Sequence, residues 1–197
     1  AATALRTLAA AAKATPAGPH TIHLAAGEYP ETESALLAPG VSLAGAGIGQ
    51  TIIRWSARQE PRDSKASPEA DKTAIRAENT ANASISGFTL IGNLPDDQRA
   101  NTGITVLGAH DFSIHDCKVK GFEFTGIWMH DAVGSTIRNN HLEDNGLPHR
   151  ESCSGGLQIG HMTDCTIHHN TIREHRGAYG IKTCIPEWTQ RNDPWSA

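Results

Sequence analysis

The strongest constraint on the fold is an internal repeat of aliphatic residues. Three positions recur, and the second and third lie ten and fifteen residues after the first. The first position holds Ile75, Ile104, Ile127, Leu157 and Ile181. The second holds Ile85, Ile114, Ile137 and Ile167, and the third holds Leu90, Val119, Leu142 and Ile172. Ile, Leu and Val make up 32 of the 197 residues yet fill all thirteen places, so chance is a poor explanation.

The repeat units differ in length only in the segment that follows the third position. Successive units span 29, 23, 30 and 24 residues, counted from one first position to the next. Around each first position apolar residues alternate with others, as in a strand with one buried face. Each unit therefore predicts three short strands and one loop of variable length. Such units bury their apolar face only by stacking, about 4.8 Å apart, as in a parallel β-helix.

Five segments resemble known proteins of this kind. They are "TIHLAAGEYPE", "VSLAGAGIGQTIIR", "FSIHDCKV", "STIRNNHL" and "CTIHHNTI". They resemble the right-handed parallel β-helix proteins of the pectin lyase-like superfamily, of the polysaccharide lyase type. The resemblance implies an all-β fold with three strands per coil, repeats of about 23 residues over 20–197, and an N-terminal capping helix within 1–18. We expect a single domain over 1–197, because no shift of composition marks a linker.

The N-terminal segment predicts the capping helix from its own pattern. Leu5, Leu8 and Ala12 share one helical face, Thr3 is the predicted N-cap, and Pro16 ends the helix. Two basic residues interrupt its alanines, so it lacks the continuous apolar centre of a signal peptide. The resemblance nevertheless implies a secreted or periplasmic protein from which a signal peptide has been removed.

Composition excludes several classes of partner and cofactor. The net charge is −4 and the basic residues are scattered, which disfavours nucleic-acid binding. No run approaches the roughly 20 apolar residues of a membrane span. Four cysteines, at 117, 153, 165 and 184, lack Cys-x-x-Cys spacing, which disfavours a zinc ribbon or a disulfide scaffold. We expect free thiols, mostly buried, with Cys165 among the inward positions.

Two polar columns have structural explanations. Asn140 and Asn170 fall at the corner between the second and third strands, where stacked amides hydrogen-bond along the column and tolerate left-handed backbone. Glu143 falls between Lys120 and Arg173 on neighbouring coils. That column predicts a surface ion-pair ladder, contributing about 0 to 1 kcal/mol per pair.

Histidines are frequent on the second strands, but their pattern disfavours a metal site. His115, Arg138 and His168 form one outward row. His168 and His169 are consecutive strand residues, so we expect them to face opposite ways. Together with His175 they are interpreted as structural or solvated residues.

The three longest predicted loops indicate where a site lies. Segments 55–73, 92–101 and 144–154 each follow a third strand and precede the next first strand, so they project on one side. Loops that rise beside a sheet form a cleft. In the superfamily that this chain resembles, carbohydrate usually lies along the sheet of first strands, which implies a substrate cleft there.

The outward positions of that sheet supply the candidate site residues. The predicted substrate-binding residues are Arg76, Trp128, Gln158 and His161, and the predicted catalytic residues are His130, Asp131 and Lys182. An exposed Trp128 would stack on a sugar ring, with Gln158 and Lys182 on the next two coils. The alternative is a solvated sheet face with an incidental tryptophan.

Carboxylate placement favours elimination over hydrolysis. Hydrolysis of a glycosidic bond needs two carboxyl groups roughly 5 to 10 Å apart. Asp131 is well placed, whereas Glu78 lies two coils below it and Glu151 lies in a loop. Elimination from a uronate needs a base at the C5 proton, a cation for the carboxylate and a proton donor, roles that Lys, His and Arg serve.

The segment "YGIKT" resembles the alginate- and chondroitin-cleaving β-helix lyases, in which a first-strand Lys is the base. The resemblance implies this role for Lys182. The acidic metal-binding motif of those lyases is not found around it, so we expect no cofactor, with Ca²⁺ as the weakly supported alternative.

The leading hypothesis is therefore a lyase that cleaves an acidic, uronate-containing polysaccharide. A glycoside hydrolase or epimerase on the same fold, and a non-catalytic carbohydrate-binding or adhesin-like solenoid, are the alternatives. The expected partner is a polysaccharide or oligosaccharide.

The last repeat unit begins at Ile181 but lacks its second aliphatic position, where Arg191 stands. An uncovered last coil exposes sheet edges and apolar core. We expect either a cap made by Trp188 and Trp195 or, preferably, further coils beyond residue 197 or a second chain stacked there.

Overall fold

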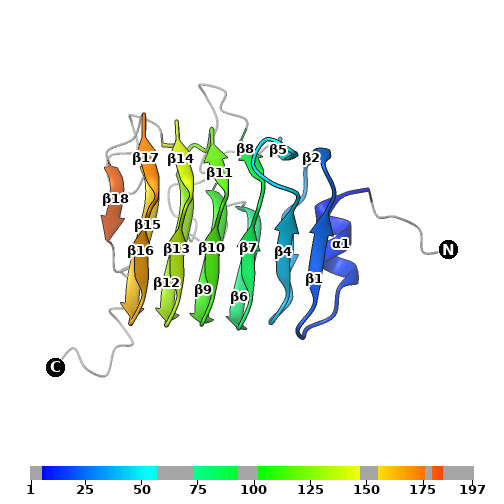
Figure 1. Ribbon diagram of the computed structural model, residues 1–197, viewed down its shortest axis with the longest axis horizontal. Coiled ribbons are helices and arrows are strands. Elements are labelled where there is room, and N and C mark those ends of the chain that lie inside the picture. Colours follow the sequence, from blue (N-terminus) through cyan, green and yellow to red (C-terminus); the bar gives the residue numbers. More distant parts are fainter. Residues whose placement is uncertain (1–5, 57–72, 93–101, 147–154, 176–178, 184–197) are drawn as a thin grey trace, which may run out of the picture.

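The structure, a computed structural model, describes residues 6–56, 73–92, 102–146, 155–175 and 179–183. Within them the chain forms a helix, α1 (Leu8–Ala14), and then strands that wind into successive coils. The coils build three parallel sheets, named here A, B and C, with α1 at one end of the stack (Figure 1). Nowhere in these residues does a helix reach the length and apolar content that a membrane span requires.

The strands follow one another through the three sheets in turn. Sheet A contains β1 (Thr21–Leu24), β4 (Ser42–Gly45), β7 (Ser84–Ser86), β10 (Ser113–His115), β13 (Thr136–Arg138) and β16 (Thr166–His168). Sheet B contains β2 (Gly27–Glu31), β5 (Thr51–Trp55), β8 (Thr89–Ile91), β11 (Lys118–Lys120), β14 (His141–Glu143) and β17 (Thr171–Arg173). Sheet C contains β3 (Ala35–Leu37), β6 (Thr73–Ala81), β9 (Thr102–His110), β12 (Thr125–Val133), β15 (Gly155–Thr163) and β18 (Tyr179–Thr183).

Strand pairing confirms the register predicted from the repeat. The five first positions pair in order across sheet C, from Ile75 to Ile181. The second positions pair across sheet A and the third across sheet B. Ile104 and Ile127 are fully buried, as expected for the shared core of stacked coils. The predicted parallel β-helix is therefore correct.

The last described strand presents apolar surface to solvent. Ile181 is 52% exposed, and Ile172 of the preceding strand is half-buried. The residues proposed as a cap, Trp188 and Trp195, lie outside the described residues, as does Arg191. The expectation about further coils or a second chain therefore stays a prediction.

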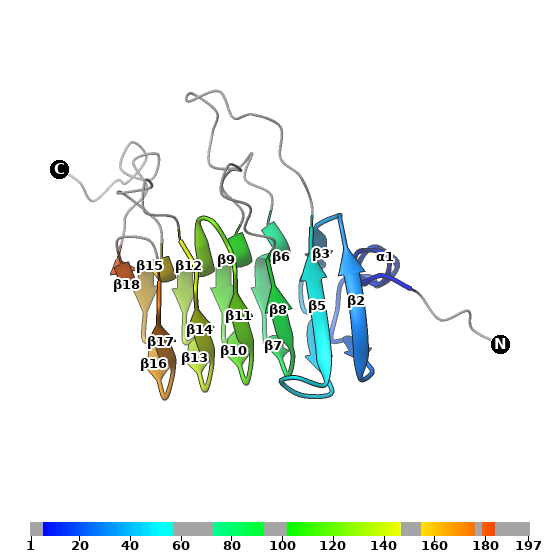
Figure 2. The same cartoon turned by 90° about the horizontal axis from the view of Figure 1, so that it is seen from above.

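The helix α1 packs against the first coil and covers its core (Figure 2). Leu8 and Ala12 are buried, as predicted. The N-cap, however, is Thr7 and not Thr3, because the Thr7 hydroxyl accepts the N–H of Ala10 at 3.1 Å. The carboxylate of Glu31 in β2 accepts the first helical N–H groups, including that of Leu8. These hydrogen bonds connect the N-terminal end of α1 to sheet B. Leu5 and Thr3 lie outside the described residues.

The Asn column between sheets A and B is structural, as predicted. The Asn140 amide donates to the Ile114 carbonyl at 2.9 Å and to Asn170 Oδ1 at 3.0 Å, and its oxygen accepts the Cys117 N–H at 3.1 Å. The left-handed residue is not Asn140 but the residue before it, Asn139, with φ 55°. The turn thus directs the Asn140 side chain into the core, where it replaces the missing strand hydrogen bonds.

A second ladder of this kind, between sheets B and C, was not predicted. Asn145 Oδ1 accepts the Phe122 N–H at 3.1 Å, and its amide donates to the Val119 carbonyl at 3.0 Å. On the next coil His175 occupies the equivalent place, and its Nδ1 accepts the Asn145 N–H at 3.2 Å. This histidine is therefore structural, as predicted, and acts as a neutral acceptor.

His175 should make the last described coil sensitive to acid. Burial lowers the pKa of His175, opposed by the nearby charge of Asp144. In the unfolded chain the pKa of His175 is about 6.5, and in the folded protein it is lower. As pH falls below about 6.5 the unfolded chain therefore binds a proton more readily than the folded protein, so stability falls. We expect His175→Asn, which extends the ladder with an amide, to lose less stability between pH 7.5 and about pH 5.5 than the wild type. Thermal unfolding at both values measures this, and an unchanged pH dependence would contradict it. His168→Asn, at an exposed site, is the control.

Of the two cations predicted to pair with Glu143 on sheet B, Arg173 is confirmed and Lys120 is wrong. Arg173 Nη2 lies 3.2 Å from Glu143 Oε2, as predicted. The second cation is Lys118, whose Nζ lies 2.5 Å from Oε1, and not Lys120. Lys120 is in register with Glu143, but the diagonal Lys118 reaches the carboxylate. Both cations hold the pKa of Glu143 below its usual value, Lys118 more strongly.

Two expectations about sheet A also need correction. The side chains of His168 and His169 were expected to face opposite ways, but their Nδ1 atoms lie 2.6 Å apart. His169 follows β16 at a corner with φ 54°, which returns its side chain to the same face. Cys165 packs against the core but is only half-buried, whereas Cys117 is fully buried and its pKa is raised to about 12. Both thiols are free, as predicted; Cys153 and Cys184 lie outside the described residues.

Candidate functional site

The outer face of sheet C carries the predicted site residues. The three loops predicted to wall a cleft fall largely on 57–72, 93–101 and 147–154, outside the described residues, and so does Glu151. The described strands that flank them run from sheet B to sheet C at the same corner of each coil. The position of the site can therefore be judged from sheet C itself.

A column of left-handed residues interrupts the long strands of sheet C. It contains Asn79 (φ 46°), Gly108 (φ 65°), Asp131 (φ 53°) and His161 (φ 49°). The strand pairing skips these residues and resumes at the next one, where Ala109 and Ala132 point into the core. Asparagine, aspartate and glycine tolerate this backbone best. Its consequence is that His130 and Asp131, although consecutive, do not alternate between the faces of the sheet.

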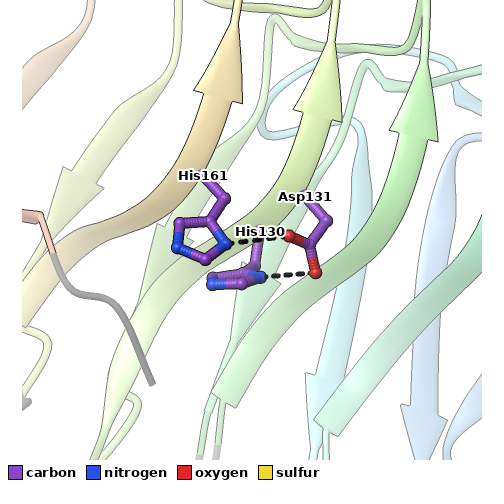
Figure 3. A group of neighbouring side chains, drawn as sticks. All are labelled: His130, Asp131 and His161. Atoms are coloured by element: carbon purple, nitrogen blue, oxygen red, sulfur yellow. Dashed lines mark hydrogen bonds and ion pairs between the residues drawn. The ribbon is translucent and has the colours of Figure 1, made fainter. Parts of the chain in front are cut away.

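His130, Asp131 and His161 meet on this face (Figure 3). His130 Nδ1 lies 2.8 Å from Asp131 Oδ2, and His161 Nδ1 lies 3.2 Å from Asp131 Oδ1. The two imidazole rings face each other with centroids 4.8 Å apart and planes inclined by 42°. The predicted contact of Asp131 with His161 on the next coil is thus present, and His130 completes the cluster. We call these three residues the His–Asp–His cluster.

The three members differ in their access to solvent. The His130 side chain is fully buried, whereas those of Asp131 and His161 are 47% and 35% exposed. A carboxylate only accepts hydrogen bonds, so a neutral His161 donates its Nδ1–H to Asp131 Oδ1 and keeps its lone pair on Nε2. This arrangement fixes the tautomer of the His161 ring, as in sites where histidine acts as a base oriented by aspartate.

Trp128 and Gln158 are placed by the register as predicted but are not exposed. They pair on β12 and β15, with Lys182 next in the row on β18. Trp128 is 8% exposed and Gln158 5%. The edge of Phe124 contacts the indole, with ring centroids 6.4 Å apart. The expectation of an open tryptophan face was therefore wrong for this structure, while its role in binding substrate stays a prediction.

Glu123 was missed by the sequence analysis. The residue is only 1% exposed and lies just before β12, beside Phe124. Buried carboxylates are uncommon unless they are paired. The signal in the sequence was a single acid between two phenylalanines, "GFEF", at a position where the repeat predicts a corner.

The two predicted cations lie at opposite ends of the row. Arg76 on β6 is in register with Thr105, which pairs with Trp128. Its Nε donates to Glu78 Oε1 at 2.5 Å, so Glu78 is held by a neighbour on its own strand. Lys182 is half-buried, with its Nζ 5.2 Å from the centroid of the Tyr179 ring. The structure thus gathers His130, Asp131 and His161, and spreads the other four candidates along the sheet.

Comparison with known proteins agrees with this architecture. The family model described as "Right handed beta helix region" matches residues 71–186, more than half of the chain. No curated protein matches the chain.

Several solved structures share the fold at low sequence identity. The ORF18 protein of Geobacillus virus E2 is 15% identical, with a TM-score of 0.56, over 83% of this chain and 32% of that one. A pectin methylesterase mutant in complex with a hexasaccharide is 13% identical, with a TM-score of 0.52, over 83% of this chain and 63% of that one. The chain thus spans less than two thirds of either protein. At such identity the likeness shows the fold alone, which is a fold shared with carbohydrate-active enzymes.

Proposed function

Because this chain belongs to the right-handed β-helix family, we propose that it is a carbohydrate-active enzyme that removes the C5 proton of a uronate in an acidic polysaccharide. The observation that carries the proposal is the His–Asp–His cluster on the outer face of sheet C. The solved pectin methylesterase that shares the fold was crystallised with a hexasaccharide, but at 13% identity it shows the fold alone, so the argument rests on the cluster. A polysaccharide substrate would place the protein outside the cytoplasm.

The chemistry assigns roles to two members of the cluster, His161 and Asp131. The neutral imidazole of His161 is exposed enough to reach substrate, and its Nε2 lone pair accepts the proton as the C5–H bond breaks. Asp131 stabilises the imidazolium that forms. Loss of the C4–O bond then completes β-elimination and gives an unsaturated uronate, with the leaving oxygen taking a proton from water and His161 later releasing the C5 proton to solvent. Return of a proton to the opposite face of C5 would instead give epimerisation.

Lys182 defines a competing assignment of the base. It lies one strand and three residues away from His161 in the register, a separation on the order of 10 Å. Our proposal uses only one of the two groups, His161, as the base for the C5 proton. In our proposal Lys182 binds the carboxylate of a neighbouring sugar, and the cluster is the reaction centre.

A panel of polyuronates, including alginate, pectate and glycosaminoglycans, tests the function. The expected result is ultraviolet absorbance from unsaturated uronate ends. Incorporation of solvent deuterium at C5 without that absorbance would identify an epimerase, with the same proton-abstraction step.

Two other outcomes would overturn the proposal. Reducing ends that appear without absorbance or deuterium incorporation would indicate a glycoside hydrolase. Retention on an immobilised polyuronate with no product after long incubation would indicate a binding module. Among the described residues Trp128 and Gln158 are buried, so their side chains do not form an exposed platform for a binding module.

A further inference from the structure

We infer that the His–Asp–His cluster is also a binding site for one divalent transition-metal ion, with Zn²⁺ as the best-suited probe. The metal would lie between Asp131 and the two imidazoles, whose Nδ1 atoms are 2.8 and 3.2 Å from its oxygens. This site follows from the geometry of the cluster and does not depend on the proposed reaction. Only its consequence for activity rests on the proposed function.

The ligand types select the class of metal. Two imidazole nitrogens and one carboxylate oxygen suit Zn²⁺ and its first-row neighbours, whereas Ca²⁺ and Mg²⁺ prefer sites made of oxygen ligands. The Ca²⁺ alternative considered from the sequence therefore does not fit these three residues.

The distances suit coordination after small side-chain movements. The three ligand atoms lie within 4.8 Å of one another, and the Asp131 oxygens are already 2.8 and 3.2 Å from the two Nδ1 atoms. Bonds of about 2.0 to 2.1 Å in a tetrahedral site separate neighbouring ligand atoms by about 3.3 Å. The longest separation must therefore shorten by roughly 1.5 Å, which rotation of the exposed His161 side chain supplies.

The surroundings supply rigidity on one side and access on the other. His130 is fully buried and Asp131 is fixed in left-handed backbone, so two of the ligands are preorganised. The partial exposure of Asp131 and His161 gives an ion a route from solvent. Three protein ligands leave a fourth position open, as in catalytic zinc sites.

Metal and proton transfer compete for the same atoms. An ion bound by both Nδ1 atoms displaces the proton through which Asp131 orients the His161 ring. On the proposed function, Zn²⁺ would therefore inhibit turnover and a chelator would restore it.

The test measures Zn²⁺ binding to the full chain by calorimetry or equilibrium dialysis. The protein carries no histidine tag, and no substrate is present. We expect one tight site per chain, weakened about 100-fold or more in His161→Ala and in Asp131→Asn, since loss of a ligand costs at least as much as loss of a supporting group. Both residues are exposed, so neither change threatens folding. Ca²⁺ is expected to leave the site unoccupied, so Zn²⁺ affinity should not change in its presence.

The chain offers a matched control in the exposed pair His168 and His169. Their rings lie at the same centroid separation, 4.8 Å, but the pair lies elsewhere, at the end of β16 in sheet A and the corner that follows it. The double change of these residues to alanine should leave the tight site intact. Loss of the site in that variant, its persistence in His161→Ala, or no stoichiometric binding by the wild type would overturn the inference. Because no substrate is present, none of these results depends on whether the protein cleaves a polysaccharide.

Discussion

Asp131→Asn is expected to reduce turnover by about 10²- to 10⁴-fold, the range that general acid–base catalysis typically contributes. An amide in place of the carboxylate loses the charge that stabilises the His161 imidazolium, and its NH₂ group cannot accept from an Nδ1–H. The His161 ring is then free to adopt the other tautomer. The rate of unsaturated-uronate formation, or of deuterium incorporation at C5, measures the loss. Stability should hardly change, because the Asp131 side chain is 47% exposed.

Asp164→Asn is the matched control for this prediction. Asp164 is also exposed and also adopts left-handed backbone, with φ 52°, but it lies outside the cluster. Its change should leave the rate within about twofold, since surface changes away from the reacting groups have small effects. Lys182→Ala separates the two assignments of the base. A raised KM with kcat retained would support its role in binding. Complete loss of kcat in Lys182→Ala, together with wild-type turnover in Asp131→Asn, would make Lys182 the base instead.

The fold was predictable because the stacking of coils forces a periodic sequence. Each coil buries its aliphatic residues only against the same residues of the next coil, so Ile75, Ile104 and Ile127 must recur in register. The same logic located Asn140 and Asn170, whose amides satisfy buried backbone groups along the stack. A column that repeats in space repeats in the sequence.

The errors arose where the backbone departs from simple alternation. His169 was assigned to the opposite face from His168 because strand residues alternate, but it lies in a left-handed corner beyond the strand. The same feature at Asp131 and His161 assembled the cluster. In this case the residue positions predicted their proximity, but the sequence did not show that His130 would be buried behind them.

The repeat also did not predict which side chains on the outer face of sheet C are buried. The register correctly places Trp128 and Gln158 outward from the core, yet both are more than nine-tenths buried. Register fixes the direction of a side chain from the strand. What packs against the outer face, such as Phe124 against Trp128, does not follow from the periodic pattern. Lys118 shows the same limit on a smaller scale, since a long side chain reaches Glu143 diagonally across the register.

Asn140→Ala is expected to destabilise the fold by about 3 kcal/mol, the largest stability effect predicted for a polar residue here. The side chain is fully buried, and the change removes its hydrogen bonds to Cys117, Ile114 and Asn170. The N–H of Cys117 is then buried with its partner gone, and one such group costs about 1 to 3 kcal/mol. The cavity left by the amide adds to this cost. Chemical denaturation measures the loss, and a thermal midpoint lower by roughly 6 to 12 °C should accompany it.

Asn139→Gly distinguishes this effect from a general sensitivity of the corner. Asn139 is the adjacent residue, is half-buried and has φ 55°, a conformation that glycine adopts without strain. We expect its change to alter stability by no more than about 0.5 kcal/mol. Equal losses in the two variants would mean that the corner backbone, and not the inward amide, holds the coils in register. A loss below about 1 kcal/mol for Asn140→Ala would show that water or a shifted neighbour replaces the amide, and the ladder would then lose its structural role.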